Sequence, residues 1–299
     1  MIADSAYVRT CWLQACRMEV LSPKPGNVSP GRDFADASTA DFLRSAEAAA
    51  DVIAAAVGQP VGRTVLQSVR AVRTVVSHNT NLGIILLIAP LAAVPLRQTL
   101  EAGIQSVLSG LTVQDSCDVY AAIRLAAPGG LGRAEDQDVA AEPTQDLRVC
   151  MQLAAERDLI AAQYADGFRV VLQTGAEWLQ EAKERTSVQS QQVVWVALRL
   201  LAEFGDSLIA RKSGQQQSAM AAALAEKVLQ AGWPAAAEAG TALAELDAFL
   251  RSDGNRLNPG TTADLTAAIL FAALRDGRMV MDEALFAAPD CHPAGGRST

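Results

Sequence analysis

A carboxylate and two cations lie close together in the second half of the chain. Asp206, Arg211 and Lys212 fall within about one and a half turns of a helix, a spacing read directly from the sequence. Cationic side chains bind phosphate, and a carboxylate can hold a divalent cation or accept a proton. A P-loop is excluded, because an alanine replaces its second glycine and no strand precedes it. The segment therefore predicts a phosphate site, with a charged helix end as the simpler alternative.

A lysine lies between two prolines just after the first expected helix. In Pro23-Lys24-Pro25-Gly26 the prolines fix φ on both sides of Lys24, so that its ammonium can be aimed. Gly26 permits a close approach of the backbone. Glu19 falls near the end of the preceding helix. The segment predicts a binding loop, unless it is an ordinary surface turn with a solvated lysine.

A polar cluster directly precedes the most apolar run of the chain, residues 84–91. Asn79 or Thr80 can cap the helix that begins there. Because that helix is apolar on every side, it should lie at the centre of the fold. A second asparagine, Asn81, and the close-packing Gly83 exceed what a cap requires. The cluster can therefore face a binding cavity, the alternative being an ordinary cap on a core helix.

Three further segments could contact a ligand. Asn258-Pro259-Gly260 precedes the last helix, which Thr261 or Thr262 can cap. Its start could bind phosphate, but Asp264 in the first turn would oppose an anion unless Mg²⁺ lay between them. The glycine-rich residues 128–132 are a weak phosphate or sugar loop, because no strand precedes them. An acidic trio follows them, and it is either a solvated helix start or a cation site; its members are Glu135, Asp136 and Asp138.

The composition predicts an all-α protein. Hydrophobic residues make up 50% of the 299 and aromatic residues only 5%, and the abundant alanine favours helices over strands. No domain boundary is visible, so residues 1–287 are expected to form one large multi-helix domain around a central buried apolar helix, followed by a loose tail at 288–299. Helical patterns cover about 4–21, 39–57, 61–77, 84–94, 97–109, 113–127, 144–165, 167–184, 188–204, 216–231 and 235–251, and a last apolar helix follows residues 258–260.

Charge and composition exclude several classes of function. The formal charge of −8 without a dense basic run argues against nucleic acid and anionic membranes as partners. The N-terminus does not resemble a signal peptide and the apolar run is too short to span a bilayer, so we expect a cytoplasmic protein. Five cysteines without a Cys-x-x-Cys pair argue against a zinc site, and two histidines leave little material for a catalytic triad.

In their order along the chain, these segments resemble the triphosphoribosyl-dephospho-CoA synthase family over nearly the whole sequence. The matching pieces are Glu19 with Pro23-Lys24-Pro25-Gly26, residues 41–46, Asn79-Thr80-Asn81-Leu82-Gly83, residues 120–132, Asp206 with Arg211, and Asn258-Pro259-Gly260 with residues 263–265. The resemblance implies an all-helical enzyme. It also implies that the 5-triphosphoribosyl group of ATP moves to a ribose hydroxyl of dephospho-CoA, with release of adenine.

The sequence departs from the family pattern in three places. Asn81 and Leu82 replace the histidine and lysine of Asn-Thr-His-Lys-Gly, residues 31–36 replace a histidine–aspartate–methionine stretch, and the Asp206 segment lacks a histidine before its arginine. These departures resemble a divergent branch that we associate with one-carbon metabolism on tetrahydromethanopterin-like cofactors. They allow a second reading, in which the transferase acts on another acceptor.

Cleavage of a ribosyl–adenine bond predicts roles for the matched residues. A carboxylate would stabilise the oxocarbenium-like sugar and another would take the proton of the attacking hydroxyl; the candidates are Asp206, Asp264 and Glu19, the last of which could instead pair with Lys24. Mg²⁺ bound by Asp206 and Asp264 would hold the triphosphate. The substrate-binding candidates are Lys24, Gly26, Asn79, Asn81, Gly83, Arg211, Lys212, Asn258 and Gly260.

A third reading, from a different functional class, is a non-catalytic nucleotide-binding or assembly protein on the same scaffold. Retention of Lys24, Asp206, Arg211 and Asp264 argues against it. The sequence does not decide the acceptor or the oligomeric state, for which a homo-oligomer is one option.

Overall fold

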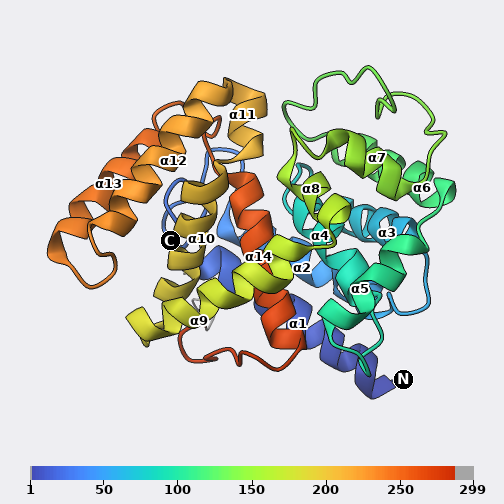
Figure 1. Ribbon diagram of the computed structural model, residues 1–299, viewed down its shortest axis with the longest axis horizontal. Coiled ribbons are helices and arrows are strands. Elements are labelled where there is room, and N and C mark those ends of the chain that lie inside the picture. Colours follow the sequence, from blue (N-terminus) through green and yellow to red (C-terminus); the bar gives the residue numbers. More distant parts are fainter. Residues whose placement is uncertain (1, 287–299) are drawn as a thin grey trace, which may run out of the picture.

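The computed structural model describes residues 2–286, and this part of the chain is helical and contains no strand. The expected tail at 288–299 lies outside the described residues. Figure 1 shows the arrangement. The elements are α1 (Ile2–Leu21), α2 (Thr39–Ala54), α3 (Val61–Arg73), α4 (Leu82–Ala92), α5 (Leu100–Ser109), α6 (Val113–Ala126), α7 (Leu147–Ala154), α8 (Leu159–Asp166), a π-helical segment η1 (Val170–Thr174), α9 (Gly175–Arg185), α10 (Gln189–Phe204), α11 (Ser207–Ser213), α12 (Gln215–Gln230), α13 (Ala237–Leu250) and α14 (Gly260–Arg275).

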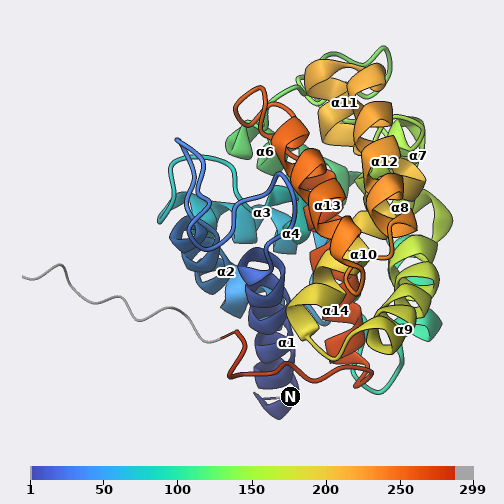
Figure 2. The ribbon, with the colours of Figure 1, turned by 90° about the vertical axis from the view of Figure 1, so that its left-hand side faces the viewer.

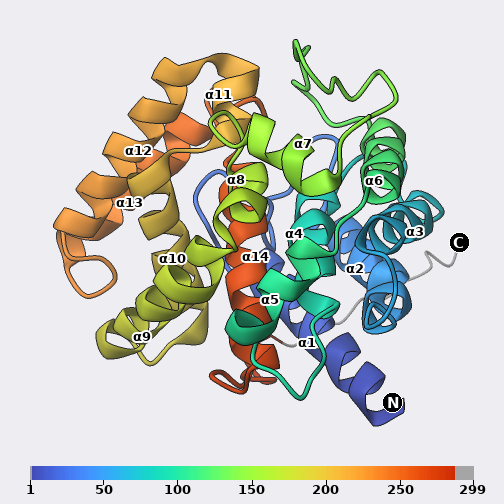
Figure 3. The same ribbon diagram turned by 45° about the vertical axis from the view of Figure 1, so that its right-hand side comes forward.

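Two buried helices, α4 and α14, form the centre of the fold and pack against each other. Every residue of α4 is buried, which confirms that the apolar run is the central helix. In Figure 3, α14 passes through the middle of the molecule with the other helices around it. Because both helices are apolar around most of their circumference, neither could face water on any side. The N-termini of both helices are thereby fixed in the interior.

A smaller apolar cluster joins α10, α11, α12 and α13 beside the main core. Figure 2 shows α12 and α13 side by side on the outside of this part, with α10 beneath them. Its members are mostly alanine, leucine and valine, which permits close helix packing. This cluster places α11, and with it Arg211 and Lys212, near the start of α14.

The single helix expected over 144–165 is wrong, because the structure contains two helices there, α7 and α8. The backbone turns at residues 155–158, and Asp158 caps the second helix by accepting hydrogen bonds from the amides of Ile160 (2.9 Å) and Ala161 (3.2 Å). The apolar spacing continues through the turn, so that it hides the break. An aspartate inside a helical pattern is the signal that marks such a break.

The cap expected for α4 is confirmed, whereas the cap expected for α14 is wrong. Asn79 accepts from the amide of Leu82 at 3.3 Å and so caps α4, as one of the two expected residues. Neither threonine caps α14, because Thr262 donates to Asp206 instead of accepting. Among residues 2–286, no helix combines the length and apolarity needed to cross a bilayer.

Candidate active site

A cavity of about 600 Å³ lies where α4, α6, α7, α8, α11 and α14 approach one another. The loop between α6 and α7 and the loop between α1 and α2 complete its wall. Charged side chains on the wall include Glu19, Asp158, Asp264, Arg211 and Lys212. The cavity has the size of a small-molecule site, and it collects these charged groups from four segments that are distant in the sequence.

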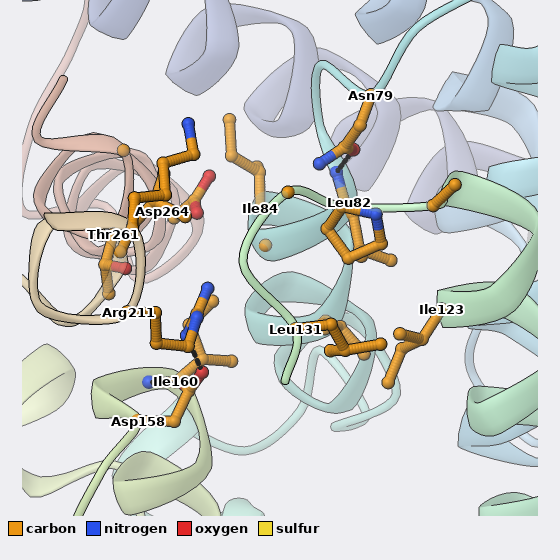
Figure 4. Close-up of a pocket in the computed structure, with 18 of the residues that line it drawn as sticks. Asn79, Leu82, Ile84, Ile123, Leu131, Asp158, Ile160, Arg211, Thr261 and Asp264 are labelled. Carbon is orange, nitrogen blue, oxygen red and sulfur yellow. Dashed lines mark hydrogen bonds and ion pairs between the residues drawn. The ribbon is translucent and has the colours of Figure 1, made fainter. Parts of the chain in front are cut away.

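Asp264 points into this cavity from the first turn of α14 (Figure 4). No hydrogen-bond partner for its carboxyl group is found among the described residues. Removal from water raises the pKa of Asp264 well above its usual range, and the nearby Glu19 carboxylate raises it further. The positive charge of Arg211 lowers the pKa of Asp264 and partly offsets this rise. Asp264 is thus a carboxyl group that holds a proton more readily than an ordinary aspartate and can present it to a ligand.

Gly83 leaves the space that the Asp264 carboxyl group occupies. A Cβ atom at Gly83 would overlap the Oδ2 and Cγ atoms of Asp264. The glycine of the motif therefore adjoins the candidate acid directly. Its role is to admit a side chain of α14 against the start of α4, which sequence spacing alone could not reveal.

We expect Gly83→Ala to displace the Asp264 side chain and to lower kcat at least tenfold with little change in fold, since α4 accepts alanine readily. Steady-state kinetics and circular dichroism would measure the two effects. The matched control is Gly240→Ala in α13, where a Cβ atom meets no neighbour within 4 Å. Equal activity of both variants would show that Asp264 does not need this space.

Arg211 is held at the cavity by an ion pair with Asp158. Asp158 uses Oδ1 to cap α8 and Oδ2 to bind the guanidinium. Figure 4 shows this pair beside Asp264. Arg211 also lines the cavity, and within residues 2–286 its buried Nε atom has no hydrogen-bond partner. The pair fixes a cation next to the candidate acid, and Asp158 is a residue that the sequence interpretation did not assign to the site.

Lys212 lies beside Asn258 at the same wall. Its Nζ atom donates to Asn258 Oδ1 at 3.2 Å, and both residues line the cavity. The glycine-rich loop packs on the aliphatic stem of the lysine: a Cβ atom at Gly129 or Gly130 would lie 3.2 Å from it. Partial burial lowers the pKa of Lys212. The expected grouping of Arg211, Lys212, Asn258 and Gly260 at one cavity is found.

Glu19 and Lys24 form an ion pair at the wall of the cavity. Lys24 Nζ lies 2.9 Å from Glu19 Oε1, and it also donates to backbone carbonyl oxygens of Glu19 and Ser22. Glu19 lines the cavity, whereas Lys24 is only 2% exposed and lies behind it. The ion-pair option for Glu19 is therefore present in the structure. The geometry gives no contact between Lys24 and a phosphate in the cavity.

Lys24→Met should destabilise the protein by about 3–5 kcal/mol, because the change leaves the Glu19 carboxylate buried without its cation. Urea denaturation would measure the loss. The double variant Lys24→Met/Glu19→Gln should recover most of the stability, since it removes the unpaired charge as well. A stable single variant with weakened ATP binding would instead assign Lys24 to the phosphates.

Asp206 was expected to bind a metal ion or act on the sugar, but it does not line the cavity. It is 1% exposed and lies behind the cavity wall. Its Oδ1 atom accepts from the amides of Leu208 and Ile209 at the start of α11. Its Oδ2 atom accepts from the amide (2.8 Å) and hydroxyl (2.9 Å) of Thr262 in α14. Burial raises the pKa of Asp206. Four donors thus saturate the carboxylate, which joins two helices and has no oxygen left for a metal or substrate.

The remaining candidates fall on and behind the cavity wall. Asn79 lines the cavity, but Asn81 is buried, and neither of its amide atoms has a partner among the described residues.

Gly26 lies behind the cavity at φ 72°, and its amide donates to Asp247 at 2.8 Å. Asp247 also binds Arg32, and thereby fastens the loop between α1 and α2 to α13. The sequence pattern gave no sign of this anchor, because Asp247 lies 221 residues from Gly26.

Whether this cavity can bind Mg²⁺ depends on which carboxyl oxygens do not already accept hydrogen bonds. No group of three or more His, Cys, Asp or Glu side chains among residues 2–286 could hold a metal ion. The oxygens of Asp206 are saturated, whereas those of Asp264 face the cavity. Mg²⁺ is commonly held by one or two carboxylates together with substrate phosphates. The residues fit such a shared site at Asp264 and do not fit a metal site made by the protein alone.

Comparison with known proteins identifies the family of the chain. The family model of ATP:dephospho-CoA triphosphoribosyl transferases matches residues 5–282. Among solved structures, a protein from Archaeoglobus fulgidus described as a presumed triphosphoribosyl-dephospho-CoA synthase superposes with a TM-score of 0.61 and 27% sequence identity. The match covers 79% of this chain and 99% of that chain. No curated protein matched significantly. The chain belongs to the ATP:dephospho-CoA triphosphoribosyl transferase family.

Proposed function

We propose that the protein is a transferase that moves the 5-triphosphoribosyl group of ATP to a ribose hydroxyl of dephospho-CoA and releases adenine. The observation that carries this proposal is the cavity in which the carboxyl groups of Glu19 and Asp264 adjoin the cations of Arg211 and Lys212. The transferase family of the chain supports the same reaction. Two carboxyl groups and a cationic wall are the groups that transfer of a phosphorylated sugar requires.

The two carboxyl groups fit complementary roles. When the bond between the base nitrogen and ribose C1′ breaks, its electron pair leaves with adenine, which must take up a proton. Asp264 can donate that proton, because burial and neighbouring carboxylates favour its protonated form. The acceptor hydroxyl loses a proton as its oxygen bonds to C1′. Glu19 lines the same cavity and can receive this proton, while its charge stabilises the positive sugar.

The cations would hold the triphosphate. Arg211 has its guanidinium and Lys212 its ammonium group on residues that line the same wall. Mg²⁺ on the phosphates would neutralise further charge when bound, and Asp264 would share it only in its ionised form, not while it holds the proton for adenine. Asp158 keeps Arg211 in place whether or not the nucleotide is present. The arrangement favours a nucleotide whose phosphates lie at α11 and whose sugar lies beside α14.

The direct test is chromatography of adenine released from ATP with Mg²⁺, with and without dephospho-CoA. We expect adenine only when dephospho-CoA is present, together with a product heavier by one triphosphoribosyl group in mass spectrometry. Absence of adenine release under these conditions would contradict the proposed reaction. Calorimetry with ATP would then separate a changed acceptor, for which ATP still binds, from a protein that does not use ATP.

A further inference from the structure

The cavity has two chemically different ends (Figure 4). Arg211, Asp158 and Asp264 lie on one side of the view. On the other side lie Leu82 and, across from it, two further aliphatic residues, which we call with Leu82 the apolar end: Leu82, Ile123 and Leu131. Leu131 is 46% exposed although it lines the cavity. An uncovered leucine on a concave wall is a surface that an apolar ligand group can cover.

Asp264 lies on the charged side of the cavity, beside Arg211 (Figure 4). Its carboxyl group occupies the space over Gly83, which directly follows Leu82 in the chain. The charged side and the apolar end therefore adjoin each other at the start of α4. A ligand that spans the cavity would place its anionic part at Arg211 and its apolar part at the apolar end.

Two polar groups near the apolar end are partly occupied. Asn79 Oδ1 accepts from the amide of Leu82, which leaves the Nδ2 atom as a donor. The Tyr120 hydroxyl donates to the carbonyl oxygen of Gln137 at 2.5 Å, so it fastens the loop that carries Leu131. This end therefore offers aliphatic contacts and the Asn79 amide donor, and His78 and Arg133, which are near Asn79 and Leu131 in the chain, also line the cavity.

We propose that the apolar end binds the adenine base of ATP, with the triphosphate at Arg211 and Lys212 and the ribose beside Asp264. The inference rests on the proposed function and adds the position of the donor nucleotide. A purine has two apolar faces and a polar edge, which suits aliphatic walls and the Asn79 amide. In this position the base–ribose bond lies beside the candidate acid, where its cleavage needs a proton.

Dephospho-CoA is the competing occupant, because it also joins an adenosine to phosphates and carries a pantetheine arm. It has two phosphates, whereas ATP has three. The two cations at Arg211 and Lys212 therefore favour the triphosphate of ATP at the charged side, with its base at the apolar end.

The test compares Leu131→Ala with Leu153→Ala. Both leucines are 46% exposed, but Leu153 is on α7 and does not line the cavity. Calorimetry uses three probes: adenine, ATP and inorganic tripolyphosphate. Leu131→Ala should weaken adenine and ATP binding about tenfold, for the loss of roughly one side chain of apolar contact. It should leave tripolyphosphate binding unchanged, and Leu153→Ala should change none of the three.

A second variant tests the polar edge. Asn79→Ser keeps an oxygen that can cap α4 but removes the amide donor. We expect several-fold weaker adenine binding with an unchanged melting temperature. Unchanged adenine and ATP affinity in Leu131→Ala would overturn the inference, and a raised KM for dephospho-CoA in that variant would assign this end to the pantetheine arm. Adenine release by the wild-type protein tests the proposed function separately.

Discussion

Asp264→Asn should lower kcat by about 10²–10⁴-fold, the usual contribution of a general acid, and should raise the melting temperature at neutral pH by a few degrees. The loss of activity follows because an amide cannot donate the proton that adenine needs. The gain in stability follows from the raised pKa of Asp264, whose ionised form is disfavoured by burial and by Glu19. An active-site group that opposes the stability of the fold is a common cost of function.

The pH dependence follows from the direction of the shift. The folded-state pKa of Asp264 lies above its ordinary value of 3.8, so between these two values the folded protein holds a proton that the unfolded chain has lost. The corresponding stability is fully present below pH 3.8 and is lost as pH rises through the folded-state pKa. The stability difference between Asp264→Asn and the wild type should therefore grow from acidic to neutral pH. The wild-type kcat should fall on the alkaline side as the donor loses its proton.

Calorimetric melting over a pH series and kcat–pH profiles measure the two effects. Glu245→Gln is a suitable control, because this carboxylate is exposed, paired with Lys227 and outside the cavity wall. It should change neither profile. A wild-type rate that does not fall on the alkaline side would contradict the assignment of Asp264 as the proton donor.

Asp206→Ala should cost at least about 3 kcal/mol of unfolding free energy, because it removes the caps of two helices and leaves buried donors unpaired. Since α11 carries Arg211 and α14 carries Asp264, the variant should also weaken ATP binding through their displacement. Asp206 is thus a positioning residue, and Asp206→Asn, which keeps one full acceptor, should lose less stability.

The matched control is Asp146→Ala. Asp146 caps one helix only, by accepting from the amide of Val149 at 3.0 Å, and it lies outside the cavity wall. Its replacement should cost about 1 kcal/mol and leave ATP affinity unchanged. Urea denaturation and calorimetry with ATP measure both variants. A stable Asp206→Ala protein without transfer activity would restore the catalytic role that the sequence suggested for this residue.

The sequence predicted the elements that depend on local pattern. Alanine-rich composition and apolar spacing determine an all-helical chain, and the run at 84–91 determines its central helix. The capping role of Asn79 follows from its position before that run. Glu19 and Lys24 are separated by one short turn, so their ion pair could be predicted from the sequence. Spacing placed Arg211 beside Lys212, and the family resemblance added Asp264 to them.

The tertiary structure alone decided which carboxyl groups face the ligand. Asp206 and Asp264 both lie at helix starts, yet one is saturated by four donors and the other faces the cavity. Asp158 holds Arg211 across 53 residues, and Gly83 makes room for Asp264 of a distant helix. Sequence determines helices because their hydrogen bonds and apolar faces are local. The free or occupied state of a carboxyl oxygen depends on donors brought from elsewhere in the chain, and only packing supplies them.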